Sequence, residues 1–311
     1  MMKEIPSPRN RTLAILPDER DRLLKSLCVP EKILTGAEIT NRIIRGDLFS
    51  LFEFLPSHFV DLLILDPPYN LDKNFRRFHF RKTTTEAYLL YLKSFLLPLK
   101  RLLKKDASLY LCGDWNSCGA IQLALEECGF IIRNRITWQR EKGRGAKSNW
   151  KNCAEDIWFA TCSGSYYFDA DAVKLRKKVI APYKANGVPK DWEETSEGRF
   201  RLTAASNFLN DITVPYWSMP ENTLHPTQKP EKLMAKLILA SSREGDFVFD
   251  PFMGSGTTLV TARKLLRNFC GIEQEEEYCL YAAKRLEKAL EDKHIQGYDG
   301  QAFLERNAGN G

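Results

Sequence analysis

The sequence has no Cys-x-x-Cys pair among its eight cysteines and only four histidines, which are scattered along 311 residues. This distribution argues against a disulfide framework and against a metal site, and it favours free buried thiols. No apolar run approaches the roughly eighteen residues that a membrane-spanning helix needs. The start, MMKEIPSPRNR, lacks the apolar core of a secretion signal. We therefore expect a cytosolic protein with no membrane segment and no bound metal.

Two common nucleotide-binding fingerprints are also missing. No Gly-Lys-Ser/Thr follows the glycine-rich stretch 251–258, which excludes a P-loop. The dinucleotide fingerprint fails as well, because Leu259 stands where that motif requires its third glycine.

The chain has a net charge of +6, but its basic residues are unevenly distributed. Three segments, 71–82, 139–151 and 174–178, hold fourteen Lys and Arg against two acidic residues. They fall in predicted loops and contain Phe75, Phe80 and other aromatic residues. Cations interleaved with aromatic rings favour contact with the phosphates and bases of a nucleic acid over a merely solvated surface.

Apolar patterning predicts alternating strands and helices. We expect strands at 42–45, 61–66, 108–112, 131–138, 156–162, 247–250 and 269–272, and helices or helical turns at 18–27, 48–55, 86–104, 121–128, 231–241, 259–266 and 278–290. This alternation predicts an α/β fold with a doubly wound, mostly parallel sheet of seven strands.

The pattern is interrupted in three places, which suggests domain boundaries. Residues 1–35 form an N-terminal arm, and 293–311 form a polar tail that we expect to be frayed. Residues 171–224 show no sustained period and suggest a small irregular module inserted between a first half, 36–170, and a second half, 225–292.

The first candidate site is Asp66-Pro67-Pro68-Tyr69-Asn70, which follows the apolar run 62–65. Neither proline has a backbone N–H, so the predicted strand must end at Asp66. The carboxyl ends of strands line the ligand crevice of an open α/β sheet. A carboxylate, two rigid carbonyls and an aromatic ring would therefore meet there. The alternative is an ordinary strand end with a surface tyrosine, and a second motif favours the site.

That second motif is the strand 247–250 followed by a glycine-rich turn and a helix. Gly254 and Gly256 allow a close approach of ligand to backbone, and the helix start offers free N–H groups to an anion. Glu273 ends the next predicted strand, the position of an acidic residue that binds ribose hydroxyls.

Together these segments resemble a known family, the S-adenosylmethionine-dependent amino-methyltransferases of DNA, in the permuted β class whose catalytic motif precedes its cofactor motif. Asp66-Pro-Pro-Tyr69 is similar to the family's catalytic motif and Asp250-Pro-Phe-Met-Gly-Ser-Gly-Thr257 to its cofactor loop. His225-Pro-Thr-Gln-Lys-Pro230 resembles the segment before that loop. The resemblance covers roughly residues 36–292 and implies a methyltransferase-type sheet with a target-recognition region at 171–224.

The resemblance also implies roles for individual residues. Asp47 would meet the adenine of S-adenosylmethionine, Glu273 its ribose, and Phe252 its purine or methionine end. The methionine end would be surrounded by Thr227, Lys229, Gly254, Gly256 and Thr257, with Lys229 as the partner of its carboxylate. The catalytic set would be Asp66, Pro67, Pro68 and Tyr69, and the cofactor set Asp47, Asp66, Thr227, Lys229, Asp250, Phe252, Gly254, Ser255, Gly256, Thr257 and Glu273.

Elementary chemistry supports the catalytic motif. An exocyclic base amine is a poor nucleophile because its lone pair is conjugated into the ring. Asp66 and the Pro67 carbonyl can accept its two N–H bonds and direct the lone pair at the methyl group. The amine is unreachable inside a duplex, so the base must be flipped out, and Tyr69 is placed to stack on it.

For the DNA we expect two kinds of contact. Arg76, Arg77, Arg81, Lys142, Arg144 and Lys147 would meet phosphates, whereas Arg199 and Arg201, with Trp192 and Trp217, would lie in the recognition module. The resemblance implies double-stranded DNA as the partner of a monomer or homodimer in the cytoplasm, at the nucleoid. The enzyme would be solitary or part of a restriction-modification system, with a cognate restriction endonuclease for the same site.

Several alternatives stay open. Asp as the first motif residue favours adenine N6 by family habit, and the same geometry serves cytosine N4. For an enzyme that methylates RNA or protein glutamine, we would expect Asn in place of Asp66. A non-catalytic nucleic-acid-binding protein with the same fold is opposed by the intact Asp66, Tyr69, Gly254 and Gly256.

Overall fold

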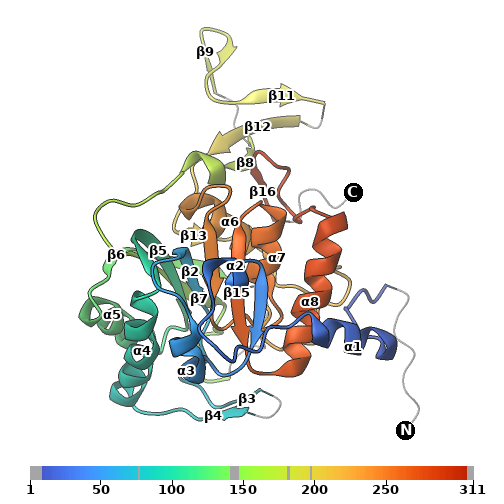
Figure 1. The fold of residues 1–311 in the computed structure, drawn as a ribbon. Helices are drawn as coiled ribbons and strands as arrows, with labels where there is room; N and C mark the ends of the chain where they lie inside the picture. The colour runs from blue at the N-terminus through green and yellow to red at the C-terminus, as the bar shows by residue number, and fades with distance from the viewer. Residues whose placement is uncertain (1–8, 76–77, 141–146, 181–182, 197, 307–311) are drawn as a thin grey trace.

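The computed structural model describes residues 9–75, 78–140, 147–180, 183–196 and 198–306. They form a three-layered α/β/α domain from which a narrow β arm projects (Figure 1). The central sheet has eight strands in the order β1-β15-β14-β2-β5-β7-β6-β13. In that order they span Arg42–Arg45, Asn268–Glu273, Phe247–Asp250, Val60–Leu65, Leu103–Gly113, Ala154–Thr161, Ile131–Gln139 and Phe208–Leu209.

The predicted doubly wound α/β sheet is confirmed, with two differences. Strands β1, β15, β14, β2 and β5 run parallel, but β7 runs antiparallel to both β5 and β6. Consecutive strands β6 and β7 pair as a hairpin, which returns the chain in the opposite direction. The sheet is therefore mixed, and the short β13 makes it eight-stranded rather than seven-stranded.

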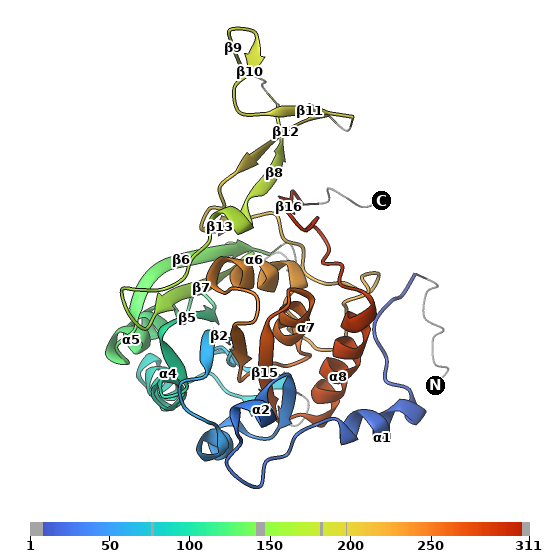
Figure 2. The same ribbon diagram turned by 45° about the horizontal axis from the view of Figure 1, so that its top comes forward.

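Helices cover both faces of this sheet (Figure 2). Alternate residues of β2 point to opposite sides. Leu63 and Leu65 join the core under α3, α4 and α5, whereas Leu62 and Ile64 join the core under α1, α6, α7 and α8. Helices α3, α4 and α5 span Leu48–Leu51, Thr85–Lys100 and Cys118–Glu127. Helices α1, α6, α7 and α8 span Pro17–Lys25, Glu231–Ser241, Thr257–Lys264 and Glu276–Glu291. Two short segments, α2 at Gly36–Ile39 and the 3-10 turn η1 at Phe52–Phe54, complete this part. No helix within the described ranges is long and apolar enough to cross a membrane.

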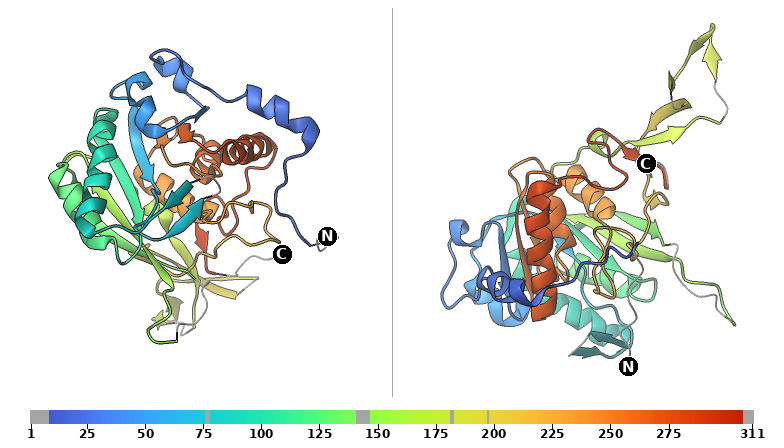
Figure 3. Two further views of the ribbon diagram at one scale, coloured as in Figure 1. Left: turned by 90° about the horizontal axis from the view of Figure 1, so that it is seen from below. Right: turned by 90° about the vertical axis from the view of Figure 1, so that its right-hand side faces the viewer.

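The N-terminal arm packs on the domain. Helix α1 lies beside α8 (Figure 3), where Leu23 is fully buried. Arg20 of α1 forms ion pairs with Glu276 and Glu277 of α8. Apolar burial and ion pairing therefore hold the described part of this segment against the second half of the chain.

The region 171–224, which we expected to be irregular, contains a projecting antiparallel ribbon. Strands β8 and β11 pair on either side of β12, and a small hairpin of β9 and β10 lies farther out. The arm comprises the turn η2 at Asp171–Val173 and the strands Leu175–Lys178, Lys184–Ala185, Val188–Pro189, Glu193–Thr195 and Gly198–Thr203. Each strand has two to six residues, too few to give a clear alternating pattern in the sequence. A separate hairpin, β3 at Lys73–Phe75 with β4 at Phe78–Phe80, follows the Asp66 motif.

The prediction of a frayed C-terminal tail is wrong for the described residues 293–306. Strand β16, Phe303–Leu304, pairs in parallel with β8 at the base of the arm, and Phe303 is fully buried. Arg306 donates to the backbone carbonyls of Gln139 and Ile212, both at 2.9 Å. The tail therefore joins the base of the arm to the main domain.

Candidate active site

The carboxyl edge of the sheet carries a row of acidic residues. One follows or ends each of the neighbouring strands β1, β15, β14, β2 and β5: Asp47, Glu273, Asp250, Asp66 and Asp114. All five line one cavity of about 460 Å³, a volume in the range of small-molecule sites. Asp114 caps the approach to α5 by accepting bonds from the backbone N–H and hydroxyl of Ser117. The other four are among the residues predicted from the sequence.

The glycine-rich turn after β14 forms one wall of the cavity. Gly254 and Gly256 have φ angles of +52° and +77°. A Cβ at Gly254 would lie 2.8 Å from His225 Nε2, and one at Gly256 would lie 2.5 Å from the Cβ of Ala282. Both conformation and packing therefore require glycine at these positions.

Asp250 holds this turn together. Its carboxylate accepts the hydroxyl of Thr258 at 2.5 Å and the backbone N–H of Phe252 at 3.0 Å. The residue is 3% exposed, and burial raises the pKa of its carboxyl to about 7. Its polar contacts thus go to the turn and to the first turn of α7, while Phe252 packs edge-on against Phe95.

Glu273 lies directly beside Gly254. Its carboxylate accepts the backbone N–H groups of Gly254 at 3.1 Å and Glu275 at 2.7 Å, and burial raises its pKa to about 7. On the neighbouring strand, the exposed Asp47 accepts the backbone N–H of Ser50 and so caps α3. A fixed carboxylate can accept hydrogen bonds from hydroxyl groups, and its position beside a glycine turn and an aromatic ring is suited to binding a nucleoside.

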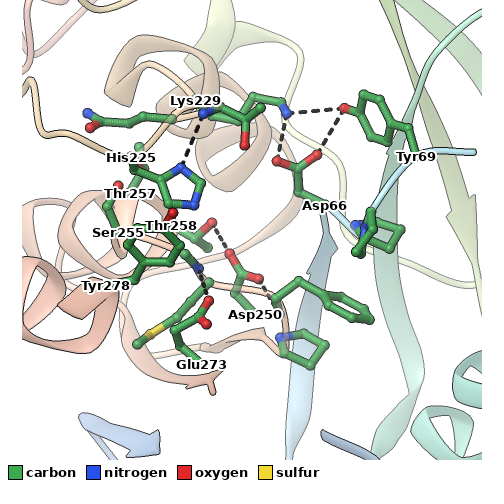
Figure 4. Close-up of a pocket in the computed structure, with 18 of the residues that line it drawn as sticks. Asp66, Tyr69, His225, Lys229, Asp250, Ser255, Thr257, Thr258, Glu273 and Tyr278 are labelled. Atoms are coloured by element: carbon green, nitrogen blue, oxygen red, sulfur yellow. Dashed lines mark hydrogen bonds and ion pairs between the residues drawn. The ribbon is translucent and has the colours of Figure 1, made fainter. Parts of the chain in front are cut away.

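The opposite wall contains Asp66, Tyr69 and Lys229 (Figure 4). Asp66 Oδ1 accepts the hydroxyl of Tyr69 at 2.9 Å, and Asp66 Oδ2 accepts the ammonium of Lys229 at 2.6 Å. Lys229 Nζ also lies 3.1 Å from the Tyr69 oxygen. Lys229 thus joins the motif at 66–69 to the His225–Pro230 segment.

The ionisation states of this cluster follow from its surroundings. Burial, and then the nearby carboxylates of Asp66 and Glu155, raise the pKa of Tyr69 well above its ordinary value, so its hydroxyl keeps its proton. For Lys229, burial alone would lower the pKa, but Asp66 and Glu155 outweigh it and raise the pKa. Tyr69 is therefore a hydroxyl donor and Lys229 a cation.

Sequence reasoning missed two charged residues of this wall, Glu155 and Arg140. Glu155 Oε2 lies 3.3 Å from both Tyr69 Oη and Lys229 Nζ, and its Oε1 pairs with Arg140. Glu155 stands near the start of β7 and reaches this edge only because β7 is antiparallel. A signal existed in the sequence, since Glu155 and Asp156 begin an otherwise apolar strand.

A third missed residue supports the glycine turn from α8. Arg285, 4% exposed, donates to the Ser255 carbonyl at 2.9 Å, to the Thr257 hydroxyl at 3.0 Å and to Glu231 at 2.9 Å. Thr227 also lines the cavity, and its N–H donates to His225 Nδ1 at 3.4 Å.

The expected DNA-binding residues are only partly described. Arg76, Arg77, Lys142 and Arg144 lie outside the described residues, whereas Arg81 and Lys147 are exposed. Arg199 and Arg201 are exposed on β12, where they pair with Glu194 and Asp191. Of the two tryptophans, Trp217 is half exposed, but Trp192 is buried and donates to the Tyr183 carbonyl.

Comparison with known sequences gives consistent matches. A family model described as DNA methylase, of the N6 and N4 methyltransferase type, matches residues 60–284. The DNA adenine methyltransferase YhdJ of Escherichia coli K12 is 30% identical over 289 residues, which are 92% of this chain and 94% of that protein. The type II methyltransferase M.BglII of Bacillus subtilis is 30% identical over 254 residues, which are 76% of this chain and 66% of that protein.

Solved structures show the same architecture. The complex of M1.HpyAVI with S-adenosylmethionine has a TM-score of 0.53 and 26% identity, covering 78% of this chain and 98% of that one. The PvuII cytosine-N4-specific DNA methyltransferase has a TM-score of 0.58 and 17% identity, covering 85% of this chain and 94% of that one. At that identity the second comparison concerns the fold alone.

Proposed function

The chain belongs to the DNA methylase family, and we propose that it transfers a methyl group from S-adenosylmethionine to the N6 amine of adenine in double-stranded DNA. The coarser part of this statement, a DNA methyltransferase that uses S-adenosylmethionine, follows from the family match and from the relatives. The choice of adenine is the proposal.

One observation of the structure supports methyl transfer to a base amine at this site. Asp66 and the glycine turn after Asp250 come from neighbouring parallel strands and line the same cavity. A base amine held at Asp66 would therefore lie beside a ligand held at the turn. The name of YhdJ, an adenine methyltransferase that is 30% identical over nearly the whole chain, supports adenine over cytosine. Cytosine N4 is the second candidate, because Asp66 serves either amine equally well.

The glycine-turn side of the cavity would hold the cofactor. Bound S-adenosylmethionine supplies a methyl group on a positively charged sulfur. We propose that Glu273 accepts the ribose hydroxyls, that Asp47 and Phe252 contact the adenine side, and that Thr227, Gly254, Ser255, Gly256 and Thr257 surround the methionine end. Lys229 contacts Asp66, Tyr69 and Glu155 in the structure, so its role toward the methionine carboxylate stays a prediction.

The Asp66 side would hold the target base. Asp66 and the Pro67 carbonyl accept the amine N–H groups and so direct the nitrogen lone pair toward the methyl group. Tyr69 stacks on the flipped base. Asp66 would then take the proton that the nitrogen loses as the nitrogen bonds to the methyl carbon and the bond between that carbon and the sulfur breaks.

The projecting arm is the proposed DNA-reading element. An antiparallel ribbon is narrow enough to enter the major groove. Exposed Arg199 and Arg201 lie on its β12 strand, and Arg81 and Lys147 lie in the segments proposed to meet phosphates. In this proposal the catalytic half of the domain is 36–170, the DNA-reading region is 171–224, and the cofactor-binding half is 225–292. A cognate restriction endonuclease, the oligomeric state and association with the nucleoid stay predictions.

The test is to incubate the protein with labelled S-adenosylmethionine and unmethylated DNA, digest the DNA to nucleosides and identify the labelled one. We expect N6-methyladenine. Label in N4-methylcytosine would replace adenine by the second candidate. If cofactor binding is seen by calorimetry but no label enters DNA, the substrate is another molecule and the proposal fails.

A further inference from the structure

Glu155 shares the two hydrogen-bond donors of Asp66. Tyr69 Oη lies 2.9 Å from Asp66 Oδ1 and 3.3 Å from Glu155 Oε2. Lys229 Nζ lies 2.6 Å from Asp66 Oδ2 and 3.3 Å from Glu155 Oε2. Each donor therefore has a nearer acceptor on Asp66 and a second acceptor on Glu155.

The two donors differ in how they can divide their bonds. A hydroxyl has a single hydrogen, so Tyr69 donates to Asp66 or to Glu155 at any moment. An ammonium has three, so Lys229 can serve Asp66, Glu155 and the Tyr69 oxygen together. Lys229 can therefore keep its bonds to both carboxylates, whereas Tyr69 must give up its bond to Asp66 before it can donate to Glu155.

Arg140 holds the side chain of Glu155 in place. That side chain is 7% exposed, and Arg140 pairs with Oε1, the oxygen turned away from Tyr69 and Lys229. Lys229 pairs with both Asp66 and Glu155, and Arg140 pairs with Glu155. Glu155 Oε2 thus stays available as an acceptor whatever happens at Asp66.

We propose that Glu155 is a positioning residue for methyl transfer: it accepts the hydroxyl of Tyr69 when the target amine arrives, and so leaves Asp66 Oδ1 for the amine. This proposal rests on the proposed function, in which Asp66 accepts an N–H of the base. A buried hydroxyl that lost Asp66 without a second acceptor would be left unpaired, which is unfavourable. Glu155 removes that cost, so the amine enters with no net loss of hydrogen bonds.

The direct test is Glu155→Gln, which preserves size but removes the charge and one of the two acceptor oxygens. We expect the single-turnover rate, at saturating DNA and S-adenosylmethionine, to fall by roughly 10- to 100-fold. Cofactor affinity by calorimetry and DNA affinity should stay within about twofold of wild type, because the change acts through Asp66 in the reaction.

A matched control lies one residue along β7. Asp156 is equally buried, but its carboxylate accepts the hydroxyl of Thr137 at 2.8 Å and the thiol of Cys118 at 3.2 Å. Asp156→Asn should lower the melting temperature and leave the rate per folded molecule unchanged. If Glu155→Gln does not fold, Glu155→Asp keeps the charge but withdraws the acceptor, and the same loss of rate is expected.

A double-variant cycle gives the most specific evidence. In a Tyr69→Phe background, Glu155 has no tyrosine hydroxyl to accept. Adding Glu155→Gln to that background should therefore reduce the rate several times less than it does in wild type. The proposal is overturned if the two losses multiply, if Glu155→Gln keeps the wild-type rate, or if its loss matches that of Asp156→Asn. Absence of DNA methylation by the wild type would instead refute the proposed function.

Discussion

Asp66 and Asp250 both follow an apolar strand, both precede proline, and their strands are neighbours in the sheet, yet their carboxylates are used differently. The side chain of Asp66 is 20% exposed and meets an ammonium and a hydroxyl. Asp250 is almost fully buried and binds a hydroxyl and a backbone N–H of its own loop. Under the proposed function, the same local pattern presents a carboxylate to the target base on one strand and stabilises the cofactor-binding turn on the next.

The largest expected effect comes from Asp66→Asn. It keeps one acceptor oxygen but loses the negative charge that stabilises the positive charge developing on the amine. Loss of such preorganised electrostatic support typically lowers turnover by about 100-fold or more. Cofactor affinity and DNA binding should change little, as measured by calorimetry and by a DNA-binding titration. An unchanged rate per folded molecule, together with a lower melting temperature, would make Asp66 a structural residue like Asp250.

Tyr69 should show the next largest effect, and the structure separates its ring from its hydroxyl. Tyr69→Ala removes a stacking surface worth about 1–3 kcal/mol per base, so turnover should fall about 10- to 100-fold. Tyr69→Phe keeps the ring and loses only the hydroxyl that bonds Asp66 in the structure, so we expect a loss of about three- to tenfold. Single-turnover rates of both variants check this order. Equal losses would mean that the ring does not stack on the base.

What the sequence could predict was set by local chemistry. Proline without an N–H ends β2 at Asp66, and left-handed backbone requires Gly254 and Gly256, so both walls of the cavity could be located in advance. Glu155 could not be located, because its place depends on the direction of β7. That direction results from pairing between strands and leaves no periodic signal in the sequence.

The C-terminal tail was missed for a related reason. Its polar sequence suggests disorder, yet Ile295 and Ala302 are buried, and Phe303 is fully buried where β16 meets β8. That pairing joins residues 128 positions apart, Leu175 and Phe303. No local rule predicts such a contact.

Asp250→Asn should have a moderate effect, and it should act on cofactor binding rather than on the rate of methyl transfer. Asparagine cannot accept from both Thr258 and Phe252 as the carboxylate does, so the turn loosens. We expect cofactor binding to weaken about tenfold, consistent with the loss of one or two hydrogen bonds. The rate at saturating cofactor should stay within about threefold of wild type. A selective loss of rate with unchanged cofactor affinity would contradict the structural role.

The pH dependence of stability sharpens the same point. Burial raises the pKa of Asp250 from 3.8 to about 7, so the folded protein retains a proton that the unfolded chain releases. The contribution of Asp250 to stability should therefore fall as pH rises from about 4 to about 7. The asparagine side chain of the Asp250→Asn variant does not titrate, and Glu273 titrates in both proteins. The melting temperature of wild type minus that of Asp250→Asn should thus decrease by a few degrees between pH 5 and pH 7.5, and a constant difference would refute it.

The smallest expected effect concerns the basic segment 139–151, which we assign to the DNA side of the cavity. Lys147 is exposed, and a lysine that contacts a phosphate contributes charge without reading sequence. Lys147→Ala should weaken binding to any duplex by about threefold and make the slope of log affinity against log salt shallower by about one. Lys288, an exposed lysine on α8 outside the three basic segments, provides the matched control, and Lys288→Ala should change neither quantity. Cofactor affinity should be unaffected in both variants, because neither residue lines the cavity. If Lys147→Ala instead altered the preferred sequence while the salt slope stayed the same, this lysine would contact bases, and sequence reading would not be confined to the projecting arm.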